Sequence, residues 1–140
     1  SVRSLDREVH QLLNRRIREL VEAQAQSYGC QASVEFRGGY PVLVNTQPET
    51  DLARQVALEL VGAENVELQT APLTGSEDFA FLLEQVPGCY LLVGNGDNGH
   101  AEGRWSGECM VHNPHYDFND ACLAVGARLW VGLVEQYFHN

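Results

Sequence analysis

One stretch organises this sequence: Cys109-Met110-Val111-His112-Asn113-Pro114-His115-Tyr116-Asp117-Phe118-Asn119-Asp120. Pro114 cannot lie inside a helix and disfavours helix just before it, so His112 and Asn113 are predicted on an extended or turning segment. A polar loop between a strand-like run and a long apolar helix is a common place for binding or catalytic residues. The same residues also suit a structural role, because Asn119 or Asp120 can cap the following helix. His112 is therefore a candidate whose role the loop alone does not decide.

Composition limits the classes of partner. The chain has 140 residues, of which 44% are hydrophobic and 20% charged, as in a globular protein with one core. Its formal net charge of −10 repels phosphate backbones and anionic lipid, so we expect neither nucleic acid nor a membrane as partner. The sequence opens Ser-Val-Arg without an initiator Met, which suggests that it was cut from a longer chain.

The four cysteines do not form a Cys-x-x-Cys pair; they are Cys30, Cys89, Cys109 and Cys122. Free cysteine behaves as a small hydrophobe, and Cys89 and Cys122 lie in apolar runs. We therefore expect reduced thiols and a cytoplasmic location, and not a disulfide framework.

Apolar periodicity predicts four helices. The first covers residues 6–28, with Asp6 as N-cap and Gly29 as the stop. The second follows a capping box at residues 46–49 and runs to Gly62. A short third helix follows Ser76-Glu77-Asp78, which is expected to cap it, and the fourth covers residues 120–138.

Three segments are predicted as strands. Residues 31–40 alternate apolar and polar, as in a half-buried strand, whereas residues 89–93 are continuously apolar, as in a buried one. Residues 66–68 form a short third run. The order of helices and strands from residue 46 onward favours an α/β fold. We place a domain boundary near residues 45–47, where the capping box of the second helix begins.

Residues 94–99 match Gly-x-Gly-x-x-Gly, but they do not predict a nucleotide site. That fingerprint works because its third glycine opens a helix whose N-terminus takes the phosphates. Here further glycines and Trp105 follow, and Asp97 would repel phosphate. Asn-Gly pairs of this kind form turns.

With its elements placed, the chain resembles the C-terminal part of the metal-dependent amidohydrolase family of hippurate hydrolase, N-acyl-amino-acid amidohydrolases and auxin-conjugate hydrolases. The resemblance spans essentially the whole chain. It is carried by Val2-Arg3-Ser4-Leu5-Asp6, Phe36-Arg37-Gly38-Gly39-Tyr40-Pro41, Gly75-Ser76-Glu77-Asp78-Phe79, Pro87-Gly88-Cys89-Tyr90 with Gly94-Asn95-Gly96, and residues 112–120.

The resemblance implies a two-domain parent enzyme. Residues 1–45 would be the second half of a lid or dimerisation domain, and residues 46–140 the C-terminal portion of an α/β catalytic domain. The resemblance also implies a homodimer, which would form through the lid.

The implied reaction is hydrolysis of the amide bond of N-acyl amino acids such as hippurate, with a divalent metal (Zn, Mn or Co) activating water. His112 matches the family's last metal-ligand histidine, and Gly75, Ser76, Glu77 and Arg3 would contact substrate. The catalytic base and the other ligands belong to a half of the family that this sequence lacks. The resemblance thus implies no catalytic residue in this chain, which alone would be inactive and bind no metal.

An alternative comes from another class of protein. The chain could be a non-catalytic dimerisation module derived from the same fold, because a half-lid leaves an unpaired strand edge that a second copy can pair with. The metal content of the purified chain would distinguish a hydrolase from a dimerisation module, since a self-sufficient hydrolase retains its metal.

Overall fold

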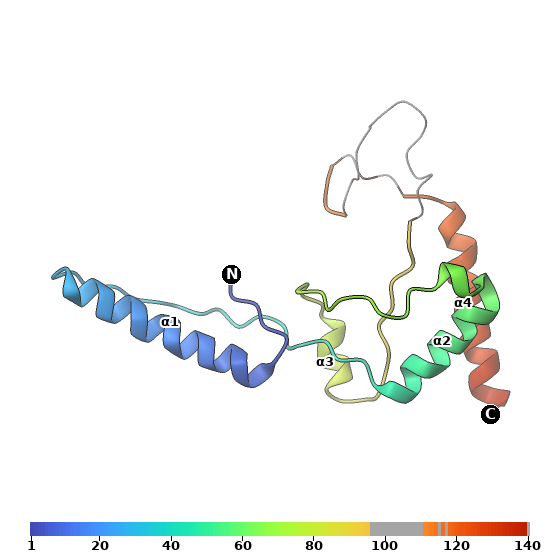
Figure 1. The fold of residues 1–140 in the computed structure, drawn as a ribbon, viewed down its shortest axis with the longest axis horizontal. Coiled ribbons are helices and arrows are strands. Elements are labelled where there is room, and N and C mark those ends of the chain that lie inside the picture. Colours follow the sequence, from blue (N-terminus) through green and yellow to red (C-terminus); the bar gives the residue numbers. More distant parts are fainter. Residues whose placement is uncertain (96–110, 115, 117, 140) are drawn as a thin grey trace. The chain divides into compact units, whose positions relative to one another are not determined.

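The computed structural model describes residues 1–95, 111–114, 116 and 118–139. Its helices are α1 (Arg7–Ser27), α2 (Gln47–Val61), α3 (Phe79–Leu83) and α4 (Ala121–His139), with a short 3-10 helix, η1 (Ala63–Asn65), after α2 (Figure 1). None of the helices in the described part has the length and apolar character needed to cross a membrane.

The chain divides into two compact units that each take two separate pieces of sequence. Unit 1 contains Ser1–Thr46 and Gln69–Gly88, and unit 2 contains Gln47–Leu68 and Cys89–Asn140. The backbone therefore passes from one unit to the other after residues 46, 68 and 88. The division into a lid at 1–45 and a catalytic portion at 46–140 stays a prediction.

Helix α1 of unit 1 begins and ends as the sequence predicts. The carboxylate of Asp6 accepts a hydrogen bond from the Val9 amide at 2.8 Å, which satisfies one of the free donors of the first turn. The helix ends at Ser27, and Gly29 follows with φ of 67°, a left-handed conformation that glycine adopts without strain.

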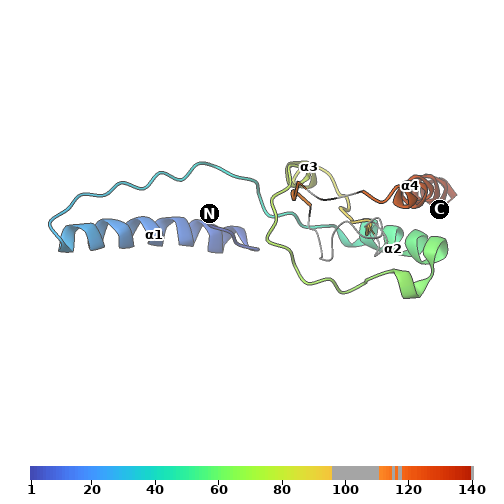
Figure 2. The ribbon, with the colours of Figure 1, turned by 90° about the horizontal axis from the view of Figure 1, so that it is seen from above.

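The segment after α1 is extended but is not a strand. Residues 31–44 run back beside α1 (Figures 1 and 2), and the Arg18 guanidinium lies 5.5 Å from the centre of the Phe36 ring. Val34 and Phe36 are half-buried while Ser33 and Glu35 are exposed, so the predicted alternation is present at residues 33–36, but Ala32 is exposed. The predicted strand pairing at 31–40 is wrong here, because a ladder needs a second backbone, and none pairs with this segment in the described part.

The second piece of unit 1 packs on the first around α3. Ala80 is fully buried. Beside it, Leu5, Val42 and Leu83 line a pocket of about 300 Å³. Thr46 holds the end of this piece, since its hydroxyl donates to the Gly88 carbonyl at 2.9 Å and accepts from the Gly88 amide at 2.8 Å.

The start of α3 corrects one prediction. The helix has only five residues, and its N-cap, Asp78, makes no side-chain capping bond. The expectation that Ser76-Glu77-Asp78 caps a helix is wrong, because Asp78 already has helical dihedrals, whereas a capping side chain needs an extended residue.

In unit 2, α2 packs against α4. Ala53 and Val56 of α2 and Leu129 of α4 are its buried apolar residues among those described, each under a tenth exposed. Gly132 lets the helices approach closely, because a Cβ added there would lie 2.8 Å from Cγ1 of Val56.

The remaining predicted strands are also unpaired. Residues 66–68 and 89–93 have no assigned strand, and helices are the regular elements of the described residues. The structure is helical there, and the α/β class is not confirmed. The amino-acid pattern of 89–93 is that of a strand covered on both faces, and it lacks strand neighbours in the part of the chain that the structure describes.

Candidate functional site

His112 lies in a turn with an unusual backbone. Its φ is 72°, in the left-handed region that few residues other than glycine adopt, although histidine is enriched there. The side chain is exposed, and the next turn is closed by the Tyr116 amide, which donates to the Asn113 carbonyl at 3.0 Å. Cys109, His115, Asp117 and residues 96–99 of the glycine-rich motif lie outside the described residues.

Two asparagines join the ends of the segment that carries His112. The Asn119 amide nitrogen of the backbone donates to Oδ1 of Asn95 at 2.8 Å, and Nδ2 of Asn119 donates to the Asn95 carbonyl at 3.0 Å. Oδ1 of Asn119 also accepts from the Ala121 amide at 3.1 Å at the start of α4. Both side chains are half-buried. The sequence predicted a cap near Asn119 but not its partner, although paired asparagines at both ends of a loop were the available signal.

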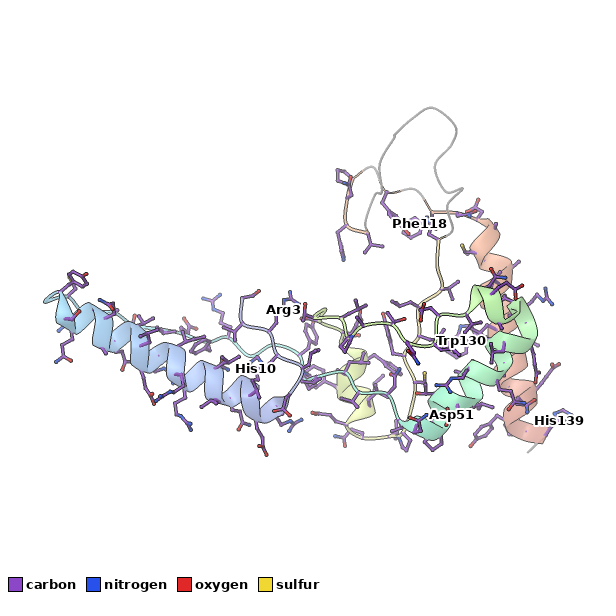
Figure 3. All side chains as sticks on the ribbon, viewed as in Figure 1. Arg3, His10, Asp51, Phe118, Trp130 and His139 are labelled. Atoms are coloured by element: carbon purple, nitrogen blue, oxygen red, sulfur yellow. The ribbon has the colours of Figure 1, made fainter. Side chains whose placement is uncertain are left out.

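The predicted substrate residues lie in unit 1, where the structure brings Arg3 to Ser76. Nη1 of Arg3 donates to Oγ of Ser76 at 3.2 Å and to the carbonyl of Thr74. Figure 3 labels Arg3 beside this loop. Gly75 and Glu77 flank Ser76 and are exposed. Arg3 and residues 75–77 therefore form one cluster of a cation and exposed polar groups.

His112 belongs to unit 2, so its grouping with Gly75, Ser76, Glu77 and Arg3 stays a prediction. The start of a long helix offers free amides to an anion. Helix α3 does not, because a five-residue helix aligns too few peptide dipoles. Any anion binding at residues 75–77 rests on the loop and on Arg3.

A metal site needs several ligand side chains close together, and the described side chains do not supply them. They contain no group of three or more His, Cys, Asp or Glu side chains that could hold an ion. An exposed imidazole is a good ligand for Zn²⁺, but a protein site needs three or four. His112 thus fits one position of a divalent site, and the described residues do not complete it.

The thiols of the described part are free: Cys30 is exposed, and Cys89 and Cys122 are half-buried. Sγ of Cys122 lies 2.9 Å from the Gly94 carbonyl and donates to it. This hydrogen bond, like those between Asn95 and Asn119, connects the segment at residues 94–95 to the segment at residues 119–122.

Comparison with known proteins gives one consistent result. Residues 6–136 match peptidase family M20/M25/M40. The chain is 31% identical over 137 residues to hippurate hydrolase from Campylobacter jejuni. It is 32% identical over 131 residues to IAA-amino acid hydrolase ILR1-like 2 from Arabidopsis thaliana. No solved structure matches.

The matches cover most of this chain but a minor part of each relative. They take in 98% of the chain and 33% of the Campylobacter jejuni protein. For the Arabidopsis thaliana protein the shares are 89% and 28%. The chain therefore spans about a third of the length of the curated relatives that it matches.

Proposed function

The chain belongs to peptidase family M20/M25/M40, and from that premise we propose that it takes part in metal-dependent hydrolysis of the amide bond of N-acyl amino acids. Membership makes a hydrolase the supported class. The observation that carries the finer proposal is the similarity to hippurate hydrolase, at 31% identity over nearly the whole chain. Hippurate is itself an N-acyl amino acid.

His112 is proposed as one ligand of a divalent metal, Zn, Mn or Co. Members of this family are generally metal-dependent, and the exposure of the imidazole supports a role in which the other ligands come from elsewhere. The metal would polarise the amide carbonyl and lower the pKa of water. The other ligands and the base would come from the two thirds of the family's length that this chain does not span.

Arg3, Gly75, Ser76 and Glu77 are proposed to recognise the substrate. An N-acyl amino acid carries a carboxylate, and a guanidinium is the side chain best matched to that group. The Ser76 hydroxyl and the exposed amides of the loop add neutral donors. The Glu77 carboxylate would repel the substrate's carboxylate, so its place is near the substrate's amide N–H, from which it can accept a hydrogen bond.

The proposed setting follows from the same resemblance. The parent would have an α/β catalytic domain and a lid, would act in the cytoplasm on a small molecule, and would form a homodimer. The free cysteines of the described part support a reducing compartment.

We expect the chain alone to show no hydrolysis of hippurate with added Zn²⁺, Mn²⁺ or Co²⁺. A longer protein that carries it with the rest of the family's residues should be active. There, His112→Ala should lower kcat/KM by more than about 100-fold, since loss of residues that merely orient metal ligands already costs 10- to 100-fold.

The assay can contradict each part of this proposal. An inactive longer protein would refute the substrate class. Turnover by the chain alone that disappears in His112→Ala would show that these residues assemble a complete site.

A second candidate function is association without catalysis. Residues 31–44 are extended with no paired strand in the described part, and Leu20 of the neighbouring α1 is 68% exposed. An open backbone edge beside apolar side chains is a template for a second copy. The oligomeric state of the purified chain tests this function.

A further inference from the structure

The loop that presents Ser76 has no regular structure of its own. Residues 69–77 contain neither helix nor strand and are exposed. A Cβ added at Gly75 would meet no atom within 4 Å, so no neighbouring group packs against this position. The loop's conformation must depend on polar contacts, because an exposed loop otherwise samples many states.

Arg3 provides such contacts from 71 residues away. One nitrogen, Nη1, donates to the Thr74 carbonyl and to the Ser76 hydroxyl, on either side of Gly75. An Nη nitrogen carries two N–H groups held in the plane of the guanidinium, so a single atom can serve both acceptors. Nε and Nη2 remain as further donors. The two hydrogen bonds of Arg3 therefore hold the residues on both sides of Gly75, and glycine has the most flexible backbone of any residue.

Several further contacts of this piece lie farther along the chain. Nη2 of Arg7 pairs with the Glu84 carboxylate, the Tyr40 ring lies 5.8 Å from the Phe81 ring, and Thr46 binds Gly88. These interactions fix α3 and residues 84–88. Among the described residues, Arg3 is the side chain that bonds Thr74 and Ser76, upstream of α3.

We propose that Arg3 is a positioning residue, which holds Thr74-Gly75-Ser76 in one conformation and so prearranges the hydroxyl and exposed amides of the loop. The role of this loop in substrate recognition rests on the proposed function. The contacts of Arg3 with Thr74 and Ser76, which we call the brace, are a property of this chain. Arg3 acts on the substrate through the loop as well as by its charge. Preorganised donors bind an anion better than donors that must first be ordered.

The test is the backbone order parameter of Gly75 and Ser76, measured by ¹⁵N relaxation on the 140-residue chain. We expect values near those of rigid backbone, about 0.8, in the unsubstituted chain and below about 0.6 in Arg3→Met. Arg3→Lys should give intermediate values, because an ammonium keeps the charge and donors but not the planar fork.

Arg37→Met is the matched control. Arg37 is an exposed arginine of the same unit, 3.5 Å from Glu35, and its loss should leave Gly75 and Ser76 unchanged. Amides of α1, in the same unit, report whether each variant is folded. If Arg3→Met unfolds the chain, Ser76→Ala replaces it and should lower the Gly75 value by a smaller amount, because the bond to Thr74 remains.

Three results would overturn the brace: a loop already mobile in the unsubstituted chain, no change in Arg3→Met or in its replacement, or an equal change in Arg37→Met. Adding hippurate to the same samples separates the two proposals. Unchanged Gly75 and Ser76 resonances contradict substrate binding by this loop in this chain, while the order parameters still decide the brace.

Discussion

His112 combines an exposed side chain with an uncommon backbone conformation. It is exposed, and its backbone is left-handed without being glycine. Such conformations cost of order 1 kcal/mol or more and gather at functional sites, where surrounding structure maintains them. The joined asparagines Asn95 and Asn119 provide part of that structure for the segment between them.

The first prediction concerns metal bound by the chain alone. After incubation with Zn²⁺ and dialysis, elemental analysis should find well under one equivalent, because one imidazole does not make a site. His112→Asn should leave that value unchanged, since asparagine tolerates the left-handed backbone. His139→Ala, on an exposed histidine of α4 (Figure 3), is the matched control. A full equivalent that His112→Asn abolishes would contradict the prediction.

Local residue roles could be predicted from the sequence, whereas distant contacts could not. The Asp6 cap spans three residues, so its partner follows from helix geometry. Thr46 is predicted to begin a helix, and α2 does begin at Gln47. Its bond to Gly88 crosses 42 residues, and no local pattern signals it. The pairing of Arg3 with Ser76 could be anticipated only as a shared role implied by family resemblance.

Among the elements, Gly126 and Gly132 of α4 allow a controlled comparison. A Cβ at Gly126 would meet nothing within 4 Å, whereas at Gly132 it would lie 2.8 Å from Val56. Val56 is buried and β-branched, so it cannot readily turn aside. The two glycines therefore differ in packing while sharing one helix.

The second prediction follows from that difference. Gly126→Ala should raise the free energy of unfolding by up to about 1 kcal/mol, the difference in helix propensity. Gly132→Ala should lower it by up to about 2 kcal/mol, because an overpacking cost of about 1 to 3 kcal/mol exceeds that gain. Urea denaturation followed by helical circular dichroism measures both. Stabilisation by Gly132→Ala would show that α2 and α4 separate easily.

Helices could be predicted far better than strands. The pattern of a helix and its hydrogen bonds both lie within one segment, so α1 and α4 appear within a residue or two of the predicted bounds. A strand needs a partner that the segment does not contain. Residues 31–40 and 89–93 have the composition of strands, and the described part of the chain supplies no partner for them.

At the scale of the whole molecule, exposed apolar surface is the main feature. The described residues have four buried hydrophobic side chains, while Trp130 and Phe138 of α4 are 70% and 78% exposed. Apolar surface on this scale marks interaction sites or aggregation. The surface is consistent with a chain that spans about a third of its relatives' length.

The third prediction is that the chain self-associates through residues 31–44. Glu35→Pro removes a backbone donor from this edge and should weaken the dimer by about tenfold, the upper range for one hydrogen bond. Thr70→Pro, in the exposed segment 69–77, is the control and should have no effect. Sedimentation velocity over a concentration series measures both, and a monomer at every concentration contradicts the prediction.

The interleaving of the two units also sets an order of events during synthesis. Residues 1–46 leave the ribosome well before Gln69–Gly88, which complete unit 1. The interval spans 42 residues, or about 2 to 8 s at ordinary elongation rates of about 5 to 20 residues per second. During that time the partners of Arg3, Arg7 and Thr46 in this piece have not yet been synthesised; they are Ser76, Glu84 and Gly88. A nascent chain paused before residue 69 should therefore lack the bonds that Arg3, Arg7 and Thr46 make to this piece, and one paused well beyond residue 88 should have formed them.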